Sequence, residues 1–210
     1  MPTQIACQLY TLREFLKTPK DAALTLAKVK KIGYDAVQVS GMGPIESKEL
    51  ARMLNGEGLA CAATHSSWEQ MRDRPAECIE HHHEIKCRHT AIGGLPKEYR
   101  NAAGYARFAK EASQVARTLK QKGNLTWSYH NHSFEFERFG AKTALQILLE
   151  ESDPACFLAE IDVYWVTHGG GDPAHWLRRV KGRAVLVHFK DMAIRNGEKG
   201  AEQLFAEVGE

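Results

Sequence analysis

The most informative stretch of the sequence is LTWSYHNHSFEFE, residues 125–137. It begins as an apolar run rich in strand-forming residues, directly after Lys122-Gly123-Asn124, which is typical of a helix end. It ends in side chains of the kinds that bind metals and transfer protons. His130 and His132 are two residues apart, so on a strand they lie on the same face. The stretch therefore predicts a buried strand that delivers two imidazoles to one site.

Apolar runs of this kind recur along the chain and alternate with helical patterns. They start near residues 5, 34, 59, 89, 125, 157 and 184. Strands that alternate with helices form a parallel sheet with helical crossovers. Seven such units predict a single domain over residues 1–210, a (β/α)₈ TIM barrel that lacks its eighth βα unit, since the complete fold takes roughly 250 residues. An open doubly wound sheet is the alternative; it is disfavoured because no glycine-rich phosphate loop follows the first strand.

The last residues of the sequence indicate whether the barrel can close. Residues 200–210 contain only a short helical pattern around Leu204-Phe205, whereas an eighth strand and helix would take roughly 30–50 further residues. We therefore expect an open seam between the first and seventh strands, with unpaired backbone and exposed apolar surface. Two explanations are open: the chain is truncated, or a partner, for which a second copy of the chain is the candidate, covers the seam.

Composition narrows the class of protein. The chain is 43% hydrophobic and 26% charged, and its net charge of +2 gives no reason to expect nucleic acid or an anionic membrane as a partner. It has no apolar run near ~18 residues and no signal-peptide pattern. Five scattered cysteines without a CxxC pair argue against a structural zinc site. We expect a soluble cytoplasmic protein with reduced thiols and a small-molecule substrate.

Two later apolar runs end in the same way as residues 125–137. Asp162 ends one of them and His188 ends the other. A carboxylate at the end of a buried strand must be paired, ligated or solvated in a cleft. Because imidazole and carboxylate are common ligands of divalent cations, we predict that His130, Asp162 and His188 share a metal site. The alternatives are a salt bridge from Asp162 to a group such as Lys190 or Arg183, and a core role for His188.

Four further residues are candidates around this site. His65 ends the run of residues 59–65, and His132 follows His130; both are predicted substrate contacts. Lys190 is predicted to place a cation beside substrate oxygens. Glu160 lies two residues before Asp162 on the same face, which suits a group behind the metal ligands.

Five motifs in order carry a resemblance to a known family. They are QLYTLR (8–13), YHNH (129–132), IDVYW (161–165), GGDP (170–173) and VHFKD (187–191). Together they resemble the sugar phosphate isomerase/epimerase group of the xylose isomerase-like TIM barrels, in the AP endonuclease 2 superfamily. The resemblance spans residues 5 to about 210 and implies a (β/α)₈ barrel with one divalent cation at its C-terminal mouth.

The resemblance also implies roles for particular residues. Asp162 and His188 match the family's ligands on strands six and seven, and His130 stands where the family carries a ligating glutamate. The family's strand-eight glutamate has no counterpart. Trp165 stands where relatives often carry a histidine, and Trp165 and Gln8 are implied substrate contacts. The implied metal is manganese, with magnesium, zinc, cobalt or iron as alternatives.

The implied reaction is isomerisation or epimerisation of a sugar, sugar phosphate or polyol through an enediolate. The metal acts as a Lewis acid, and flanking groups act as general acid and base. His130, in the place of a family glutamate, and Lys190, as a cation beside substrate oxygens, are the expected catalytic residues. Three alternatives remain. The same scaffold carries keto-inositol dehydratases and keto-glycoside lyases, for which a histidine base is natural. A barrel without its last unit could be inactive. An abasic-site endonuclease would need a basic DNA-binding face, which a net charge of +2 disfavours.

Overall fold

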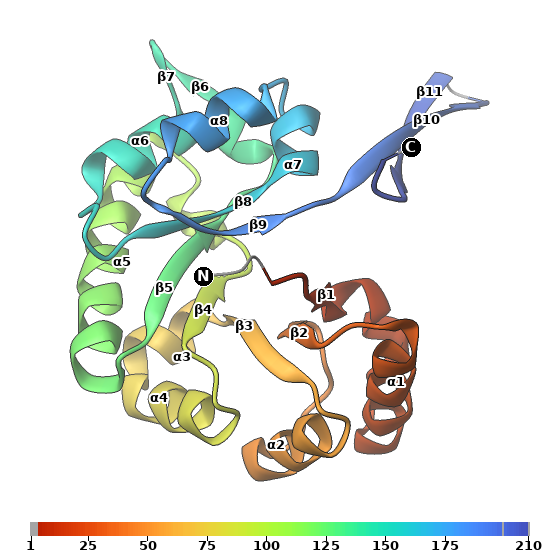
Figure 1. Cartoon of the computed structure of the whole chain (residues 1–210). Helices are drawn as coiled ribbons and strands as arrows, with labels where there is room; N and C mark the ends of the chain where they lie inside the picture. The colour runs from red at the N-terminus through yellow and green to blue at the C-terminus, as the bar shows by residue number, and fades with distance from the viewer. Residues whose placement is uncertain (1–3, 199, 210) are drawn as a thin grey trace. The chain divides into compact units, whose positions relative to one another are not determined.

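The computed structural model of the chain describes residues 4–198 and 200–209 (Figure 1). The chain divides into two compact units. The first unit comprises the residues up to Gly93 together with Gln114–Trp127, and the second comprises Gly94–Ser113 and the residues from Ser128 onward. The expectation of a single domain stays a prediction.

Four parallel strands form the sheet of the first unit. They are β1 (Cys7–Gln8), β2 (Ala36–Val39), β3 (Ala60–Ser66) and β4 (His89–Ile92), hydrogen-bonded in that order. Cys7 lies opposite Val37, and Val37 lies opposite Cys61. Each of these strands falls within two residues of the position that the sequence predicts.

Helices follow the strands of the first unit. They are the 3₁₀ helix η1 (Leu9–Phe15), α1 (Pro19–Ile32), α2 (Ser47–Gly56), α3 (Trp68–Asp73) and α4 (Pro75–Glu84). The Thr18 hydroxyl caps α1 by accepting the Asp21 N–H, and Gly33 ends α1 at a φ of +118°. The pattern over residues 72–87 predicts one helix; this is wrong, because Pro75 lacks an N–H and starts a separate helix.

The core of the first unit joins its sheet to α1 and α2. Leu26 and Val29 of α1, Val37 of β2 and Leu54 of α2 are at most 3% exposed and belong to one apolar cluster. Removal of this aliphatic surface from water is the main force that holds the two helices against the strands.

Three parallel strands form the sheet of the second unit, in the order β5 (Thr126–His130), β8 (Leu158–Asp162) and β9 (Ala184–His188). His130 pairs with Glu160, and Asp162 pairs with His188. Because the strands are parallel, their C-terminal ends, which carry the predicted ligands, lie at one edge of the sheet.

The helices of the second unit cover this sheet with aromatic residues. They are η2 (Lys97–Tyr99), the first half of α5 (Ala102–Gly123), η3 (Phe134–Phe136), α6 (Ala144–Glu151), α7 (Val163–His168) and α8 (Pro173–Arg179), with a small hairpin of β6 (Arg138–Phe139) and β7 (Lys142–Thr143). Tyr129 stacks on Phe157 at 5.8 Å and meets Phe108 edge-on at 6.0 Å. All three rings are at most 2% exposed, so they fix β5 and β8 against α5.

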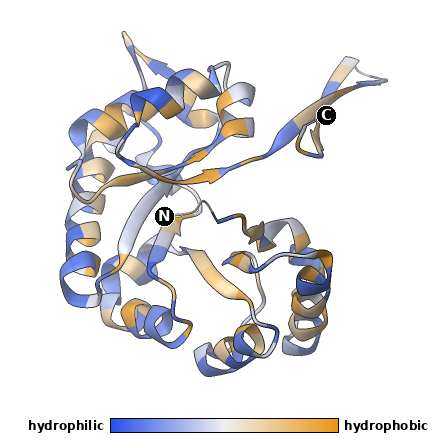
Figure 2. Cartoon of the chain, viewed as in Figure 1, coloured by the Kyte–Doolittle hydropathy of each residue, from blue (hydrophilic) through white to orange (hydrophobic). Residues whose placement is uncertain are grey.

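The residues after β9 form an antiparallel hairpin, β10 (Asp191–Gly197) and β11 (Gly200–Ala206). Figure 1 shows this hairpin extending beyond the end of β9. The predicted helical pattern around Leu204 and Phe205 is therefore wrong: the two residues pair across the hairpin with Ala193 and Met192. Apolar side chains stay exposed here, among them Phe205 at 63%. Figure 2, which colours the ribbon by hydropathy, draws parts of the hairpin in orange, the colour of hydrophobic residues. Within residues 200–209 the chain forms no eighth parallel strand.

None of the helices that the structure describes is both long and apolar enough to cross a membrane.

Candidate metal centre

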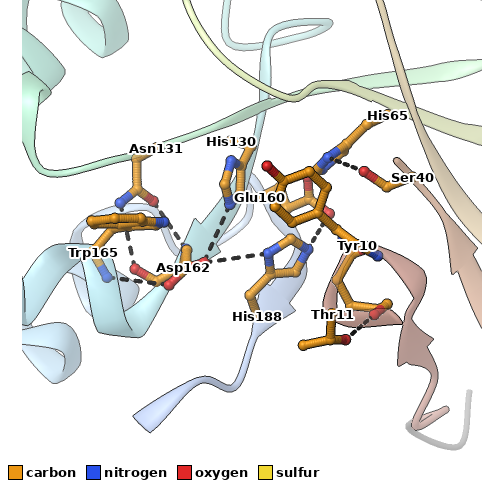
Figure 3. Close-up of polar contacts among 11 residues, drawn as sticks. Tyr10, Thr11, Ser40, His65, His130, Asn131, Glu160, Asp162, Trp165 and His188 are labelled. Atoms are coloured by element: carbon orange, nitrogen blue, oxygen red, sulfur yellow. Dashed lines mark hydrogen bonds and ion pairs between the residues drawn. The ribbon is translucent and has the colours of Figure 1, made fainter. Parts of the chain in front are cut away.

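Three side chains converge at the C-terminal edge of the second unit's sheet (Figure 3). His130 ends β5, Asp162 ends β8 and His188 ends β9. The Nε2 atom of His130 lies 3.3 Å from Oδ2 of Asp162, and Nδ1 of His188 lies 3.5 Å from the same oxygen. One ligand atom from each residue lies within 4.8 Å of the others, so the three can bind one ion. The side chains are 2–12% exposed.

The carboxylate of Asp162 is oriented by two neighbours. Asp162 is the N-cap of α7, and its Oδ1 accepts the Trp165 N–H at 3.1 Å. Asn131, fully buried, accepts the Asp162 N–H at 3.0 Å and donates to the Asp162 carbonyl at 3.4 Å. These contacts hold Oδ1 and the backbone in place and direct Oδ2 towards the two imidazoles.

Glu160 stands behind His188. It is fully buried, and its Oε1 lies 3.0 Å from Nε2 of His188. A carboxylate on one nitrogen of a histidine fixes the ring orientation and makes the other nitrogen a better ligand. With Nε2 held by Glu160, Nδ1 is the nitrogen of His188 that faces Asp162, 3.5 Å from its Oδ2. Glu160 thus lies behind a candidate ligand, and its role towards a metal stays a prediction.

The pKa values of His188 and Asp162 are both shifted strongly from their ordinary values. Burial would lower the pKa of His188, but its contacts with Asp162 and Glu160 raise it to about 9. Burial would raise the pKa of Asp162, yet the hydrogen bonds from His130 and His188 hold it well below its ordinary value of 3.8. The donor set therefore stabilises positive charge at this point, as a cation site requires.

The residues fit a divalent cation. Two imidazoles and one carboxylate form a donor set that suits iron(II), manganese, cobalt or zinc. The buried carboxylate behind His188 completes the pattern of a histidine ligand with its own acceptor.

An aromatic wall adjoins the three candidate ligands. The ring of His132 lies 4.8 Å from that of His130, 5.3 Å from Trp165 and 5.5 Å from Phe134, on which it stacks. His132 and Trp165, two of the predicted substrate contacts, thus lie together beside the ligands. Whether they contact substrate stays a prediction.

Glu135 supports the aromatic wall through hydrogen bonds to Tyr129 and to the backbone of His132. Its Oε1 accepts the Tyr129 hydroxyl at 2.7 Å and its Oε2 accepts the His132 N–H at 2.8 Å. The residue is fully buried, and burial raises its pKa to about 7. Neither Glu135 nor Asn131 is among the residues predicted from the sequence. The only signal for Glu135 is a charged residue between two phenylalanines, which also suits an exposed loop.

Lys190 and Arg183 are the alternative partners that the sequence suggests for Asp162. Arg183 instead donates to the carbonyls of Leu149 at 2.8 Å and Phe157 at 2.7 Å. The Nζ atom of Lys190 lies over three aromatic rings, at 4.0–4.7 Å from their centroids.

Two predicted substrate contacts, Gln8 and His65, belong to the first unit. The Gln8 side chain accepts the Tyr10 N–H at 3.0 Å, which caps η1. Nδ1 of His65 lies 3.1 Å from the Ser40 hydroxyl. Their roles towards a substrate stay predictions.

Comparison with solved structures identifies the fold of the chain. No protein-family model and no curated protein sequence matches the chain. Among solved structures, a sugar phosphate isomerase/epimerase from Parabacteroides distasonis matches with a TM-score of 0.76 and 25% identity, over 91% of this chain and 76% of that one. An L-ribulose 3-epimerase matches with a TM-score of 0.69 and 16% identity, over 89% and 69%.

A third neighbour is a xylose isomerase-like TIM barrel protein from Mycobacterium smegmatis in complex with magnesium. Its TM-score is 0.64 at 12% identity, over 97% of this chain and 80% of that one. The chain thus has the fold of the xylose isomerase-like TIM barrels, of which it contains seven parallel strands. Its structural neighbours include a sugar phosphate isomerase/epimerase and an L-ribulose 3-epimerase.

Proposed function

We propose that the protein is a divalent-metal-dependent isomerase or epimerase that acts on a sugar, sugar phosphate or polyol. The observation that carries the proposal is the convergence of His130, Asp162 and His188 on a volume that one ion can fill, with Glu160 behind His188. The structural similarity to a sugar phosphate isomerase/epimerase supports the class of reaction. The first metals to test are manganese and magnesium.

A bound divalent cation supplies Lewis acidity for a carbonyl oxygen of the substrate. His130, Asp162 and His188 are the residues that would hold it, since their Nε2, Oδ2 and Nδ1 atoms face one another. An imidazole that binds a metal through Nε2 cannot use that nitrogen as a base. We therefore assign His130 to ligation and the transfer of the substrate proton to His132, whose ring lies 4.8 Å from that of His130.

Metal analysis of protein purified without chelator tests the ligand set. We expect one divalent ion per chain in the wild type and loss of that ion in Asp162→Ala. The matched control is Asp35→Ala, which removes a carboxylate that is 81% exposed and pairs only with Lys30 among the contacts described. The circular dichroism of each variant reports whether it is folded. Full metal occupancy in folded Asp162→Ala would refute the ligand set.

Solvent isotope exchange tests the reaction. An enediolate route incorporates deuterium from D₂O at the carbon beside the carbonyl, whereas a dehydratase releases water and forms a conjugated carbonyl that absorbs in the ultraviolet. We expect exchange with a ketose such as L-ribulose in the metal-loaded wild type. His132→Gln should retain the metal and lose the exchange. Loss of water without exchange would replace the isomerase proposal with the lyase alternative.

A further inference from the structure

An aromatic box surrounds the ammonium group of Lys190. Its Nζ atom lies 4.0 Å from the ring centroid of Phe205 and 4.7 Å from those of Tyr164 and Trp165. Lys190 lies between β9 and β10, Phe205 belongs to β11, and both Tyr164 and Trp165 belong to α7. The box therefore ties the β10–β11 hairpin to α7, because ring faces attract a cation.

The rings of the box also contact one another. Tyr164 meets Phe205 edge-on at 4.9 Å and Trp165 edge-on at 4.8 Å. Phe205 lies 6.3 Å from Trp165, again edge-on. Phe205 is 63% exposed, so its ring acts at the surface and contributes little to the buried core.

Trp165 connects this box to the candidate metal centre. Its backbone N–H donates to Oδ1 of Asp162 at 3.1 Å, and its indole ring lies 5.3 Å from the His132 ring. The same indole thus contacts both the Lys190 ammonium and the imidazole wall. An aromatic face in such a position suits the apolar C–H face of a carbohydrate.

We propose that Phe205 and Lys190 are positioning residues that hold the Trp165 indole in place as the substrate-facing wall of the site. The claim about the substrate rests on the proposed function; the claim about the indole does not. Within the proposed function, the hairpin then sets specificity for a substrate whose carbon skeleton presents a C–H face beside His132. The ammonium of Lys190 serves chiefly to orient rings, in place of the catalytic role that the sequence suggests.

Quenching of tryptophan fluorescence by acrylamide, which is uncharged, tests the box directly. The other three tryptophans, Trp68, Trp127 and Trp176, are at most 5% exposed, so the quencher reports mainly on the partly exposed Trp165. Trp165→Phe gives the baseline. We expect the quenching constant to rise at least about twofold in Phe205→Ala and in Lys190→Met, because each change uncovers the indole. Phe205→Tyr should restore the wild-type value.

Phe189→Ala is the matched control, since Phe189 is 72% exposed, adjoins Lys190 in sequence and contributes no ring to the box. Its quenching constant should equal that of the wild type. Quenching that is unchanged in both Phe205→Ala and Lys190→Met would overturn the proposal. An equal rise in Phe189→Ala would overturn it too, because any loosening of the hairpin would then suffice.

Steady-state kinetics with L-ribulose as the probe ketose test whether the aromatic box affects substrate binding. We expect KM to rise roughly tenfold in Phe205→Ala with kcat nearly unchanged, and Phe205→Tyr to restore KM. Metal content should stay at one ion per chain; its loss would mean a general structural effect and would overturn the positioning role. If the wild type shows no turnover, the proposed function fails, while the quenching results still decide the role of the box.

Discussion

Glu160 Oε1 lies 3.0 Å from Nε2 of His188, and this contact decides which nitrogen of His188 faces the candidate metal centre. Both side chains come from neighbouring parallel strands, β8 and β9, in which Glu160 pairs with Leu186 and Asp162 pairs with His188. The two carboxylates of β8 thus flank one imidazole of β9. One of them would act as a ligand and the other would orient the ligand.

Replacement of Glu160 by glutamine should weaken metal binding without abolishing it. The glutamine amide would retain an oxygen acceptor for His188 but lose the negative charge that makes the imidazole a strong ligand. We expect an increase in the dissociation constant for Mn²⁺ of about 10- to 100-fold, measured by calorimetric titration of the metal-free protein. Glu150→Gln, in which the carboxylate is 39% exposed and remote in sequence from the ligands, should bind as the wild type does. Equal affinity of Glu160→Gln and wild type would remove Glu160 from the site.

The pH dependence of stability should carry the signature of Glu135. Its pKa in the folded protein is about 7, against an ordinary value of 4.5, so the folded state holds a proton that the unfolded state has lost. The resulting stabilisation is fully present below about pH 4.5 and is lost as the pH rises through 7, at a cost of about 3 kcal/mol. Urea unfolding of the wild type and of Glu135→Gln across pH 5–8 measures it.

The difference between the unfolding free energies of the wild type and of Glu135→Gln should change between pH 5 and 8. The size of that difference at any single pH does not matter for the test. His188, whose pKa is raised to about 9, also loses stabilisation as pH rises above 6.5, but it is present in both proteins and cancels. A difference that is constant from pH 5 to 8 would show that Glu135 does not titrate there.

Asn131→Ala should destabilise the protein by about 1–3 kcal/mol, because the Asp162 N–H and carbonyl lose their buried partner. Asn131→Asp should cost more at neutral pH, since it keeps an acceptor for the N–H but places a second carboxylate against the Asp162 carbonyl. Chemical unfolding monitored by circular dichroism gives both values. The idea fails if Asn131→Ala leaves stability unchanged, or if Asn131→Asp proves the milder change.

Gly169→Ala should be destabilising although its backbone angles suit any residue. A Cβ atom at position 169 would lie 2.5 Å from Cγ and Cδ2 of Phe136, a ring that packs edge-on against Trp176 at 5.5 Å. We expect a loss of about 1–3 kcal/mol as the ring is displaced. Gly56→Ala is the control: its Cβ meets nothing within 4 Å, and Gly56 is the last residue of α2, so stability should stay equal or rise by up to about 1 kcal/mol. Thermal unfolding of the two variants checks both signs.

Much of the fold could be predicted from local patterns. All seven parallel strands occur where apolar runs end in polar groups, because a strand buried on both faces needs such a run and its end reaches the edge of the sheet. Thr18-Pro19 and Asp172-Pro173 begin helices, since each places a capping oxygen before a proline at the first helical position. In each case the sequence signal lies within a few residues of the strand or helix start that it predicts.

The predictions that were wrong concern segments whose local pattern was ambiguous. Residues 200–206 carry a weak helical pattern, yet they pair residue by residue with 191–197 in the β10–β11 hairpin. A single turn of helix gains little by itself, whereas pairing along a hairpin satisfies the backbone of both segments. The break at Pro75 was readable from the sequence, but the helical periodicity on either side of it concealed two helices.

The parallel strands and the side chains at their ends follow from local sequence, because His130, Asp162 and His188 each end an apolar run and their residue types fix their chemistry. The contacts that support these side chains come from residues brought together by the fold. Glu160 orients His188, Asn131 orients Asp162, Glu135 holds His132, and Phe205 reaches Lys190 and Trp165 from a hairpin. Burial and strand formation follow from neighbours along the chain, whereas each supporting contact depends on strand register and on side-chain packing between distant segments.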